Sequence, residues 1–343
     1  MTVYIAGGSN SLKRDGWTRT FRETHTADAV NLSIGATMSM MAAARLYLAP
    51  QVAAGDTVVW EYGINDLNHL ARGFPLPVLL RHIEYLLNDC AARGAHVLPL
   101  YLRPLWVESP TVQPRYPSDN WRGYEGALYD LFGRYGVPIL DFSRHYRETT
   151  GASRVPDRVY SNRNHIATRP DLMHMIASAV ADRLPGHRPA ARLGLYNASR
   201  TLRIETGFCT RTFTNAALSL PVTPGPAAFT APPDGPARRV TGLLVLTHKK
   251  GGALRVSWPG GSRKVSVSNP EAGRFDRHTL KFISFEYLFG FAPELAPGET
   301  IAMDRHDAPG GVLARLQGFA RPDRQAGAGR LALIAGIATE TAH

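Results

Sequence analysis

The sequence of 343 residues contains little cysteine and no long hydrophobic run. Its two cysteines, Cys90 and Cys209, lie in segments of different character, which argues against a disulfide framework or a metal cluster. No stretch of about 18 uninterrupted apolar residues is present, so we find no candidate membrane span. The opening residues, MTVYIAGG, lack the basic, apolar and small-residue regions of a secretory signal. These absences predict a cytoplasmic protein.

Motifs for cofactors and nucleic acids are also missing. The sequence contains no phosphate loop, no dinucleotide-binding glycine motif and no His/Cys spacing typical of zinc, so we expect no cofactor and no metal. The formal net charge is +11, from 39 Lys and Arg against 28 Asp and Glu, and such a surplus attracts anionic partners. Because the arginines are scattered and no nucleic-acid motif is present, we expect no nucleic-acid partner. An acidic polysaccharide would suit the charge.

Short β-branched runs alternate with amphipathic segments through the first half of the chain, which is the pattern of βαβ units. The predicted strands lie at residues 3–6, 29–32, 57–62, 96–101 and 137–141. The predicted helices lie near residues 38–49, 76–93, 120–135 and 170–183. The pattern therefore predicts an α/β domain with one parallel sheet and helices on both faces.

Two prolines and a glycine follow the last helical pattern, in the segment LPGHRPAAR at residues 184–192. Because such residues interrupt regular structure, we place the domain boundary there, with domains at residues 1–186 and 193–343. The Pro/Ala-rich stretch at residues 221–237 is predicted to be a loop.

The second half of the chain is typical of β structure. Alternating apolar residues flank the turn Pro259-Gly260-Gly261, which indicates a hairpin, and further apolar segments lie at residues 241–247, 281–289 and 330–338. We therefore predict an all-β sandwich or jelly roll. The aromatic side chains of Trp258 and residues 282–289 suit either a core or a sugar-stacking surface. Two roles remain open for this domain, glycan binding and homo-oligomerisation.

Two predicted strands end in residues suited to acyl chemistry. The first strand runs into Gly7-Gly8-Ser9, which puts Ser9 at the carboxyl edge of the sheet, where open α/β sheets bind ligands. The second ends at Gly35, whose backbone N–H could face the same crevice because glycine allows close approach. Taken singly, both segments also fit ordinary loops or helix caps.

Two further segments complete a possible site. The third strand ends in Gly63-Ile64-Asn65-Asp66, and the Asn65 amide is a natural donor to an oxyanion, although an Asn-Asp pair can also close a turn. His165 precedes the last helix of the domain, where its imidazole could reach over the sheet edge toward Ser9. His174, on the following helix, is the competing histidine.

Taken together and in this order, the four segments resemble the SGNH/GDSL hydrolase family, whose blocks are a Gly-Asp-Ser start, a glycine, a Gly-x-Asn-Asp and an Asp-x-x-His. The resemblance covers the first 183 residues and implies a flavodoxin-like three-layer fold. It also implies that Ser9 is the nucleophile and His165 the general base. In the same way, it implies that the oxyanion hole is formed by Ser9, Gly35 and Asn65.

The sequence departs from this family pattern at two positions. Gly8 replaces the usual aspartate of the first block, and Asn162 replaces the aspartate that orients the histidine. Replacing Asp by Asn in a serine triad can cost ~10⁴ in rate. Three candidates remain for the group that holds His165: the side-chain carbonyl of Asn162, the carboxylate of Asp157 and that of Asp171.

The resemblance implies a cofactor-free serine esterase that removes an acetyl or other short acyl group from a carbohydrate or polysaccharide ester through an acyl-Ser9 intermediate. The same residues could serve a polysaccharide O-acyltransferase if a sugar hydroxyl replaced water. A catalytically inactive glycan-binding protein is the third possibility, favoured by Asn162. The hypothesis requires Ser9 Oγ to lie within about 3 Å of a ring nitrogen of His165.

Overall fold

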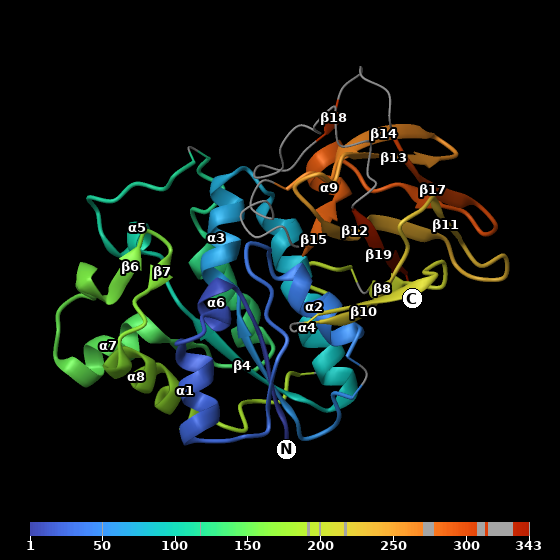
Figure 1. Ribbon diagram of the computed structural model, residues 1–343. Helices are drawn as coiled ribbons and strands as arrows, with labels where there is room; N and C mark the ends of the chain where they lie inside the picture. The colour runs from blue at the N-terminus through green and yellow to red at the C-terminus, as the bar shows by residue number, and fades with distance from the viewer. Residues whose placement is uncertain are drawn as a thin grey trace. The chain divides into compact units, whose positions relative to one another are not determined.

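The computed structural model describes residues 1–49, 51–116, 118–190, 193–198, 200–215, 218–269, 278–306, 313–314 and 332–342. Contacts between Cα atoms divide the chain into two compact units, Met1–Asn197 and Ala198–His343 (Figure 1). Both cysteines are free thiols. None of the described helices has the length and apolar character that crossing a bilayer requires.

A five-stranded parallel sheet forms the centre of the N-terminal unit. Its strands are β1 (Val3–Gly7), β2 (Ala29–Asn31), β3 (Thr57–Glu61), β4 (His96–Tyr101) and β5 (Leu140–Asp141), in the spatial order β2-β1-β3-β4-β5. This is the flavodoxin-like order, so the predicted fold is confirmed. The predicted strand at residues 137–141 is shortened to its last two residues, because Pro138 has no N–H to donate to a neighbouring strand.

Eight α-helices among the described residues of the N-terminal unit connect and cover these strands. They are α1 (Trp17–Thr24), α2 (Met40–Tyr47), α3 (Gly63–Ala71), α4 (Leu76–Arg93), α5 (Leu105–Glu108), α6 (Tyr124–Arg134), α7 (Phe142–Thr150) and α8 (Pro170–Ala181). Helices α1, α7 and α8 pack together on one face of the sheet, and α2, α4 and α6 form the other layer. Both faces of the sheet are therefore covered, as predicted.

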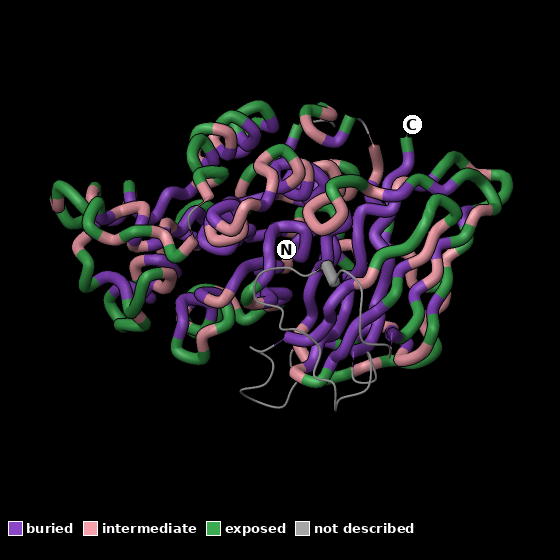
Figure 2. Tube along the Cα trace, turned by 90° about the horizontal axis from the view of Figure 1, so that it is seen from above, coloured by how far each residue is buried: buried purple, intermediate pink, exposed green. Residues whose placement is uncertain are grey.

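Burial of the central strands explains why their sequences are continuously apolar. All five residues of β1 and of β3 are buried; Figure 2 draws the buried residues of the chain in purple. Helices α1, α3, α5 and α7 were absent from the sequence prediction. They are short, and α1 buries only Trp17, Thr18 and Phe21, so its apolar pattern is weak.

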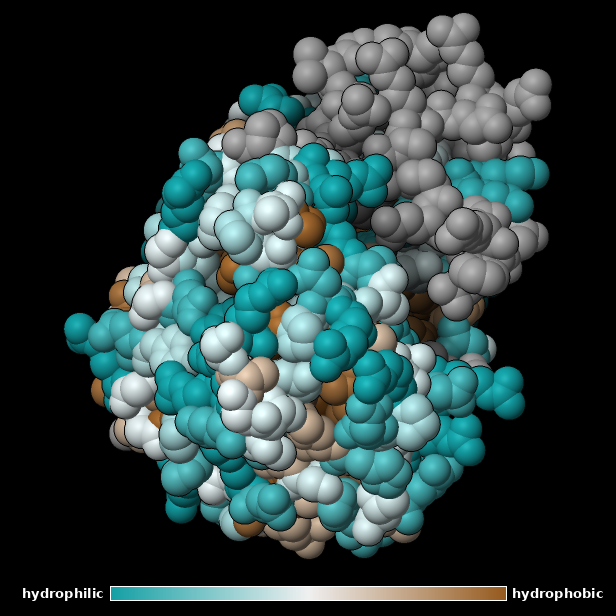
Figure 3. All heavy atoms as spheres, turned by 90° about the vertical axis from the view of Figure 1, so that its left-hand side faces the viewer, coloured by the Kyte–Doolittle hydropathy of each residue, from teal (hydrophilic) through white to brown (hydrophobic). Residues whose placement is uncertain are grey.

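The surface of the N-terminal unit is largely hydrophilic on one side. Figure 3 views the molecule from the side on which β6 (Tyr160–Asn162), β7 (His165–Ile166) and α7 lie in Figure 1. Hydrophilic residues cover most of this face, and hydrophobic residues are scattered in small groups. This face therefore has no broad apolar area among the described residues.

Two larger sheets and a two-stranded ribbon form the described part of the C-terminal unit. One has the order β11-β17-β13-β14-β18 and the other the order β15-β12-β19-β8, with β16 paired to β12 and a separate ribbon formed by β9 and β10. Their bounds are β8 Thr201–Glu205, β9 Arg211–Thr214, β10 Ser219–Val222, β11 Ala227–Thr230, β12 Arg238–Thr247, β13 Ala253–Trp258, β14 Gly261–Ser266, β15 Thr279–Ser284, β16 Glu294–Leu295, β17 Thr300–Arg305, β18 Leu313–Ala314 and β19 Leu333–Thr341.

The two larger sheets share one hydrophobic core. Leu243 of β12 and Ile337 of β19 lie in the same buried cluster as Val256 of β13 and Ile301 of β17. Two sheets that bury their apolar faces against each other form a sandwich, which confirms the predicted β-rich second domain. The predicted hairpin at Pro259-Gly260-Gly261 joins β13 to β14, which are antiparallel.

One local prediction for this unit was wrong, and one apolar segment has mixed structure. The segment at residues 281–289 holds the end of strand β15, which ends at Ser284, and helix α9 (Phe285–Phe289), with Ser284 Oγ accepting from the Tyr287 N–H at 3.4 Å. The stretch at residues 221–237 is not all loop, because it includes β11, which pairs with β17. Of the segment at residues 330–338, the first two residues lie outside the described part of the chain.

The end of the N-terminal unit is held by one buried carboxylate. Glu84 of α4 accepts hydrogen bonds from the backbone N–H groups of Leu195 (2.6 Å), Tyr196 (2.8 Å) and Asn197 (2.7 Å). The chain divides into its two units just after these residues, between residues 197 and 198.

Candidate active site

Ser9 and His165 meet although 156 residues separate them. Ser9 opens a short 3₁₀ helix, η1 (Ser9–Leu12), directly after β1, and His165 opens β7, which forms a small antiparallel hairpin with β6. The Ser9 Oγ lies 2.8 Å from the His165 Nε2. This distance meets the requirement for a serine and the base that would take its proton.

Asn162 contacts the other ring nitrogen. Its Oδ1 lies 2.8 Å from His165 Nδ1 and also accepts the backbone N–H of Asn164 at 2.9 Å. Because a backbone N–H can only donate, the shared acceptor is the amide oxygen, so Nδ1 carries a proton and Nε2 presents its lone pair to Ser9. The tautomer of His165 is therefore the one that a general base needs.

The two alternative carboxylates are engaged elsewhere. Asp157 pairs with Arg154 at 3.3 Å, and Asp171 pairs with Arg169 at 2.6 Å. His174 is exposed on α8. Of the three candidates considered from the sequence, only Asn162 is in contact with His165.

Asn10 and Lys13, which follow Ser9 in the chain, hold Ile166, the residue after His165. The Ile166 N–H donates to Asn10 Oδ1 at 3.1 Å, and Lys13 Nζ donates to the Ile166 carbonyl. Both backbone groups of one residue are thus bonded to the segment that carries Ser9, which sets the separation of Ser9 and His165. The sequence analysis missed Asn10 and Lys13, since no local pattern links them to a residue more than 150 positions away.

The surroundings of His165 favour its neutral form. Desolvation lowers the pKa of His165, and the nearby positive charge of Lys13 lowers it further. Burial also lowers the pKa of the Lys13 ammonium group. Among the described residues, the ring nitrogens bond to Ser9 and to the neutral Asn162 side chain, and to no carboxylate. An imidazole that stays unprotonated near neutral pH is available to accept a proton.

Gly35 and Asn65 lie around the same turn. A Cβ built on Gly35 would lie 3.6 Å from the Ser9 Cβ, so the Gly35 backbone is beside the serine. Asn65, in the first turn of α3, lies against Gly8. Within the described residues, neither the Gly35 N–H nor the Asn65 side-chain amide has a hydrogen-bond partner. Both donors therefore remain free for a substrate oxygen.

The position of Asn65 explains the glycine at position 8. A Cβ on Gly8 would lie 2.0 Å from Asn65 Oδ1, so an aspartate there would force the Asn65 amide to move. The buried carboxylate beneath this turn comes instead from Glu61 of β3, which accepts Ser11 Oγ at 2.7 Å and the Gly8 N–H at 3.2 Å. Burial raises the pKa of Glu61 to about 7.

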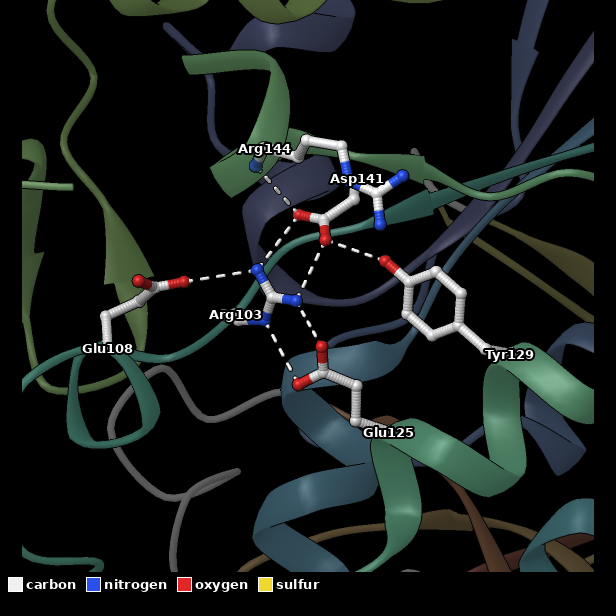
Figure 4. A network of polar contacts seen from close by, with 6 residues as sticks. All are labelled: Arg103, Glu108, Glu125, Tyr129, Asp141 and Arg144. Atoms are coloured by element: carbon white, nitrogen blue, oxygen red, sulfur yellow. Dashed lines mark hydrogen bonds and ion pairs between the residues drawn. The ribbon is translucent and has the colours of Figure 1, made fainter. Parts of the chain in front are cut away.

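A polar network supports the hairpin that carries His165 (Figure 4). Arg103, which follows β4, extends between Glu108, Glu125 and Asp141, and binds both oxygens of Asp141 at 3.0 and 2.8 Å. The Arg103 guanidinium thus links Glu108, the last residue of α5, to the carboxylates of Glu125 and Asp141.

Helix α5 in turn contacts the hairpin. The Leu105 N–H donates to the Arg163 carbonyl at 3.0 Å, and Trp106 Nε1 donates to Asn164 Oδ1 at 3.2 Å. Asn164 is the residue whose N–H determines the orientation of the Asn162 amide. Within the described residues, no group of three or more His, Cys, Asp or Glu side chains is placed to hold a metal ion.

The aromatic residues noted in the sequence divide between core and surface. Phe282 and Phe285 are buried in the C-terminal unit. Trp258 and Phe289 are partly buried, and their rings stack with centroids 6.1 Å apart. Phe291 is 40% exposed, and its ring centroid lies 5.7 Å from that of Trp258. An aromatic cluster therefore reaches the surface of this unit.

Comparison with known proteins finds a family match within the N-terminal unit and a structural likeness over both units. Residues 4–165 match the model of the GDSL-like lipase/acylhydrolase family, a range that begins in β1 and ends at His165. A two-domain esterase active on acetylated mannans has a similar structure, with a TM-score of 0.53 and 11% sequence identity over 100% of this chain and 91% of that chain. No curated protein matches the sequence.

Two single-domain structures are similar to the N-terminal part alone. They are the esterase EstA from Pseudoalteromonas sp. (TM-score 0.39, 20% identity, 53% of this chain and 94% of that chain) and a member of the lipolytic G-D-S-L family from Veillonella parvula DSM 2008 (0.42, 11%, 54% and 98%). The family match, which contains every residue of the site, and the flavodoxin-like sheet lead to one conclusion. Residues 4–165 of the N-terminal unit form a GDSL-like lipase/acylhydrolase domain.

Proposed function

We propose that the N-terminal unit is a serine esterase that removes acetyl or another short acyl group from a carbohydrate ester. The observation that carries the proposal is the hydrogen-bonded series of Ser9 Oγ, the His165 ring and Asn162 Oδ1, with both distances at 2.8 Å. This arrangement contains a nucleophile, a base in the required tautomer and a group that orients the base.

In the acylation step, His165 Nε2 takes the proton of Ser9 as Oγ attacks the ester carbonyl. The negative charge that develops on the carbonyl oxygen is stabilised by the N–H groups of Gly35 and Ser9 and by the Asn65 amide, at ~3 kcal/mol per donor. The tetrahedral intermediate then collapses, the bond between the carbonyl carbon and the sugar oxygen breaks, and the imidazolium gives its proton to the leaving sugar. An acyl-Ser9 ester remains.

In the deacylation step, His165 takes a proton from water, which attacks the acyl-Ser9 carbonyl and releases the acid. Ser9 recovers its proton from His165. A sugar hydroxyl in place of this water would make the same unit an O-acyltransferase. Hydrolysis and transfer thus differ only in whether water or a sugar hydroxyl takes the acyl group from Ser9.

The surface of the unit supports a short acyl group. The exposed large hydrophobic side chains of its described residues are Met1, Leu12, Val30, Leu193 and Leu195, and of these only Leu12 belongs to the Ser9 turn. A long acyl chain needs a wider apolar surface to leave water. The esterase that is similar over both domains and active on acetylated mannans supports a carbohydrate as the alcohol part.

For the C-terminal unit we propose a glycan-binding role. Its surface cluster of Trp258, Phe289 and Phe291 offers aromatic rings of the kind that stack on the apolar faces of sugars. Binding of a neutral glycan, measured by calorimetry, should weaken in Trp258→Ala and Phe291→Ala. Unchanged affinity in both variants would contradict this role.

The function is tested with the full chain, 4-nitrophenyl acetate and an acetylated polysaccharide. We expect a burst of nitrophenol and release of acetate from the glycan, both lost in Ser9→Ala. Ser153→Ala is the matched control, because Ser153 is an exposed serine in the turn after α7, and it should retain full activity.

Three other outcomes would change the conclusion. Transfer of acetyl to added glycan without release of acetate would show an acyltransferase. Activity that survives in Ser9→Ala would refute the assignment of the nucleophile. Inactivity of the wild-type chain toward every ester, with glycan binding intact, would leave a binding protein.

A further inference from the structure

A hollow opens beside the turn that carries Ser9. Its volume is about 480 Å³, and its walls come from η1 and the residues after it, from α1, and from Asn31 at the end of β2. We call it the α1 hollow. All of its walls belong to the N-terminal unit.

The α1 hollow is basic. The charged side chains that line it are Lys13, Arg14, Arg19, Arg22 and Glu23. Arg19 is neutralised by Asp15 at 3.1 Å and Glu23 at 2.7 Å. Arg14 and Arg22 have no ion-pair or hydrogen-bond partner among the described residues, and Lys13 donates to a neutral carbonyl. The hollow therefore presents the charges of Arg14 and Arg22, which pair with no carboxylate among the described residues.

The α1 hollow shares a wall with the candidate active site. Leu12, which lines the hollow, has its Cδ1 3.3 Å from a Cβ built on Gly35, the glycine that flanks Ser9. Ser9 and Leu12 are three residues apart in a 3₁₀ helix, which corresponds to about 6 Å along its axis. A substrate whose acyl group is at Ser9 thus needs to extend only past Leu12 to enter the hollow.

We propose that the α1 hollow binds an oxyanion substituent, a carboxylate or a phosphate, on the sugar whose ester Ser9 attacks. This inference rests on the proposed function and narrows its substrate to acidic carbohydrate esters. Guanidinium groups bind carboxylate and phosphate through paired hydrogen bonds, and Arg14 and Arg22 are the free guanidinium groups of the hollow. Thr18 and Asn31 also line the hollow, and both donate to the Ser11 carbonyl, at 3.1 and 2.8 Å.

The test compares three O-acetylated methyl glycosides: a galacturonoside with a carboxylate, a glucoside 6-phosphate and a neutral glucoside. We expect kcat/KM to be roughly tenfold higher for an anionic ester than for the neutral one at low ionic strength, and the preference to shrink in high salt. The double variant Arg14→Glu with Arg22→Glu should lose this preference while keeping the wild-type rate with 4-nitrophenyl acetate. The ratio of the two anionic esters shows which oxyanion is preferred.

The matched control is Arg188→Glu. Arg188 is exposed and lies near Gly94, which precedes β4, so it is at the amino edge of the sheet, opposite the carboxyl edge that carries Ser9. This variant changes the net charge by the same amount per residue and should keep the preference. Equal kcat/KM for anionic and neutral esters in the wild-type chain, or a preference that survives in the double variant, would overturn the proposal.

Binding without catalysis separates this inference from the proposed function. Trigalacturonate, which carries no ester, should bind Ser9→Ala in calorimetry and should bind the Arg14/Arg22 double variant at least several-fold more weakly. If the wild-type chain hydrolyses no ester but this difference in binding is found, the anion site stands and the esterase does not. If esters are hydrolysed and trigalacturonate binds both variants equally, the esterase stands and the anion site does not.

Discussion

Replacing Asn162 by aspartate would change the charge beside His165 with little change in shape. Asn162 Oδ1 accepts from His165 Nδ1 at 2.8 Å and from the Asn164 N–H at 2.9 Å, and both donors can bond to a carboxylate oxygen in the same way. Asn162 is exposed, so the second carboxylate oxygen would face solvent. The substitution Asn162→Asp therefore isolates the effect of the negative charge on the base.

The expected gain in kcat/KM from Asn162→Asp is small compared with the loss in rate known for the reverse change in serine proteases. There, an asparagine in place of the aspartate costs ~10⁴, because it stabilises the wrong tautomer of the histidine. Here the Asn164 N–H already turns the amide oxygen toward the ring, so the tautomer is correct. What remains is the difference between a neutral and a charge-assisted hydrogen bond, ~1–2 kcal/mol, or about 5- to 30-fold in kcat/KM.

The gain should depend on pH. In the wild-type chain, burial and Lys13 lower the pKa of His165, so activity should persist below pH ~6.5, the value for a free histidine. A carboxylate at position 162 stabilises the imidazolium and raises this pKa, so activity on the acid side should fall at a higher pH. The variant should be faster than wild type above pH 8, and its advantage should vanish near pH 5.

The assay is kcat/KM for 4-nitrophenyl acetate from pH 5 to 9. Asn164→Asp is the matched control, because it adds the same charge to the hairpin but keeps an acceptor for Trp106 Nε1. A gain of a thousandfold or more in Asn162→Asp would mean that the amide had held the wrong tautomer. No gain at high pH would mean that residue 162 does not accept from Nδ1.

Three further predictions concern buried or half-buried charges. Lys13→Met should move the acid limb of the kcat/KM profile to higher pH, because His165 loses a neighbouring cation. It should also lower kcat, because the Ile166 carbonyl loses its hydrogen-bond donor, whereas Lys13→Arg should keep the acid limb where it is. Burial raises the pKa of Glu61 from 4.5 to about 7, so its protonated form stabilises the fold below pH 4.5, and this contribution is lost as the pH rises to about 7. The Tm of the wild-type chain should therefore fall more steeply between pH 4.5 and 7 than the Tm of Glu61→Gln. Parallel Tm curves for the two proteins would contradict this role of Glu61. Glu84→Gln should lower the free energy of unfolding in urea by roughly 2–3 kcal/mol and speed amide exchange at residues 195–197, because the NH₂ group of glutamine cannot accept the backbone N–H groups that one carboxylate oxygen accepts. A loss below about 0.5 kcal/mol would refute this anchoring.

The local sequence determined the parallel sheet and the approximate place of each strand. Buried parallel strands are continuously apolar, so β1, β3 and β4 could be recognised without any neighbour. The carboxyl ends of parallel strands share one edge, so residues that come within a few positions of them, such as Ser9 and Asn65, could be expected to lie near each other. Short helices such as α1 and α9 could not, because too few of their residues are buried to mark a period.

Only the tertiary structure decided which groups surround His165. Asn162, Asp157 and Asp171 are all close to it in sequence, and the fold selects Asn162 because the β6–β7 hairpin turns that side chain back onto the ring, while arginines engage the two aspartates. Likewise, Asn10 and Lys13 reach Ile166 only when β1 and the hairpin meet at the edge of the sheet. Such contacts join residues more than 150 positions apart, and a local pattern carries no information about them.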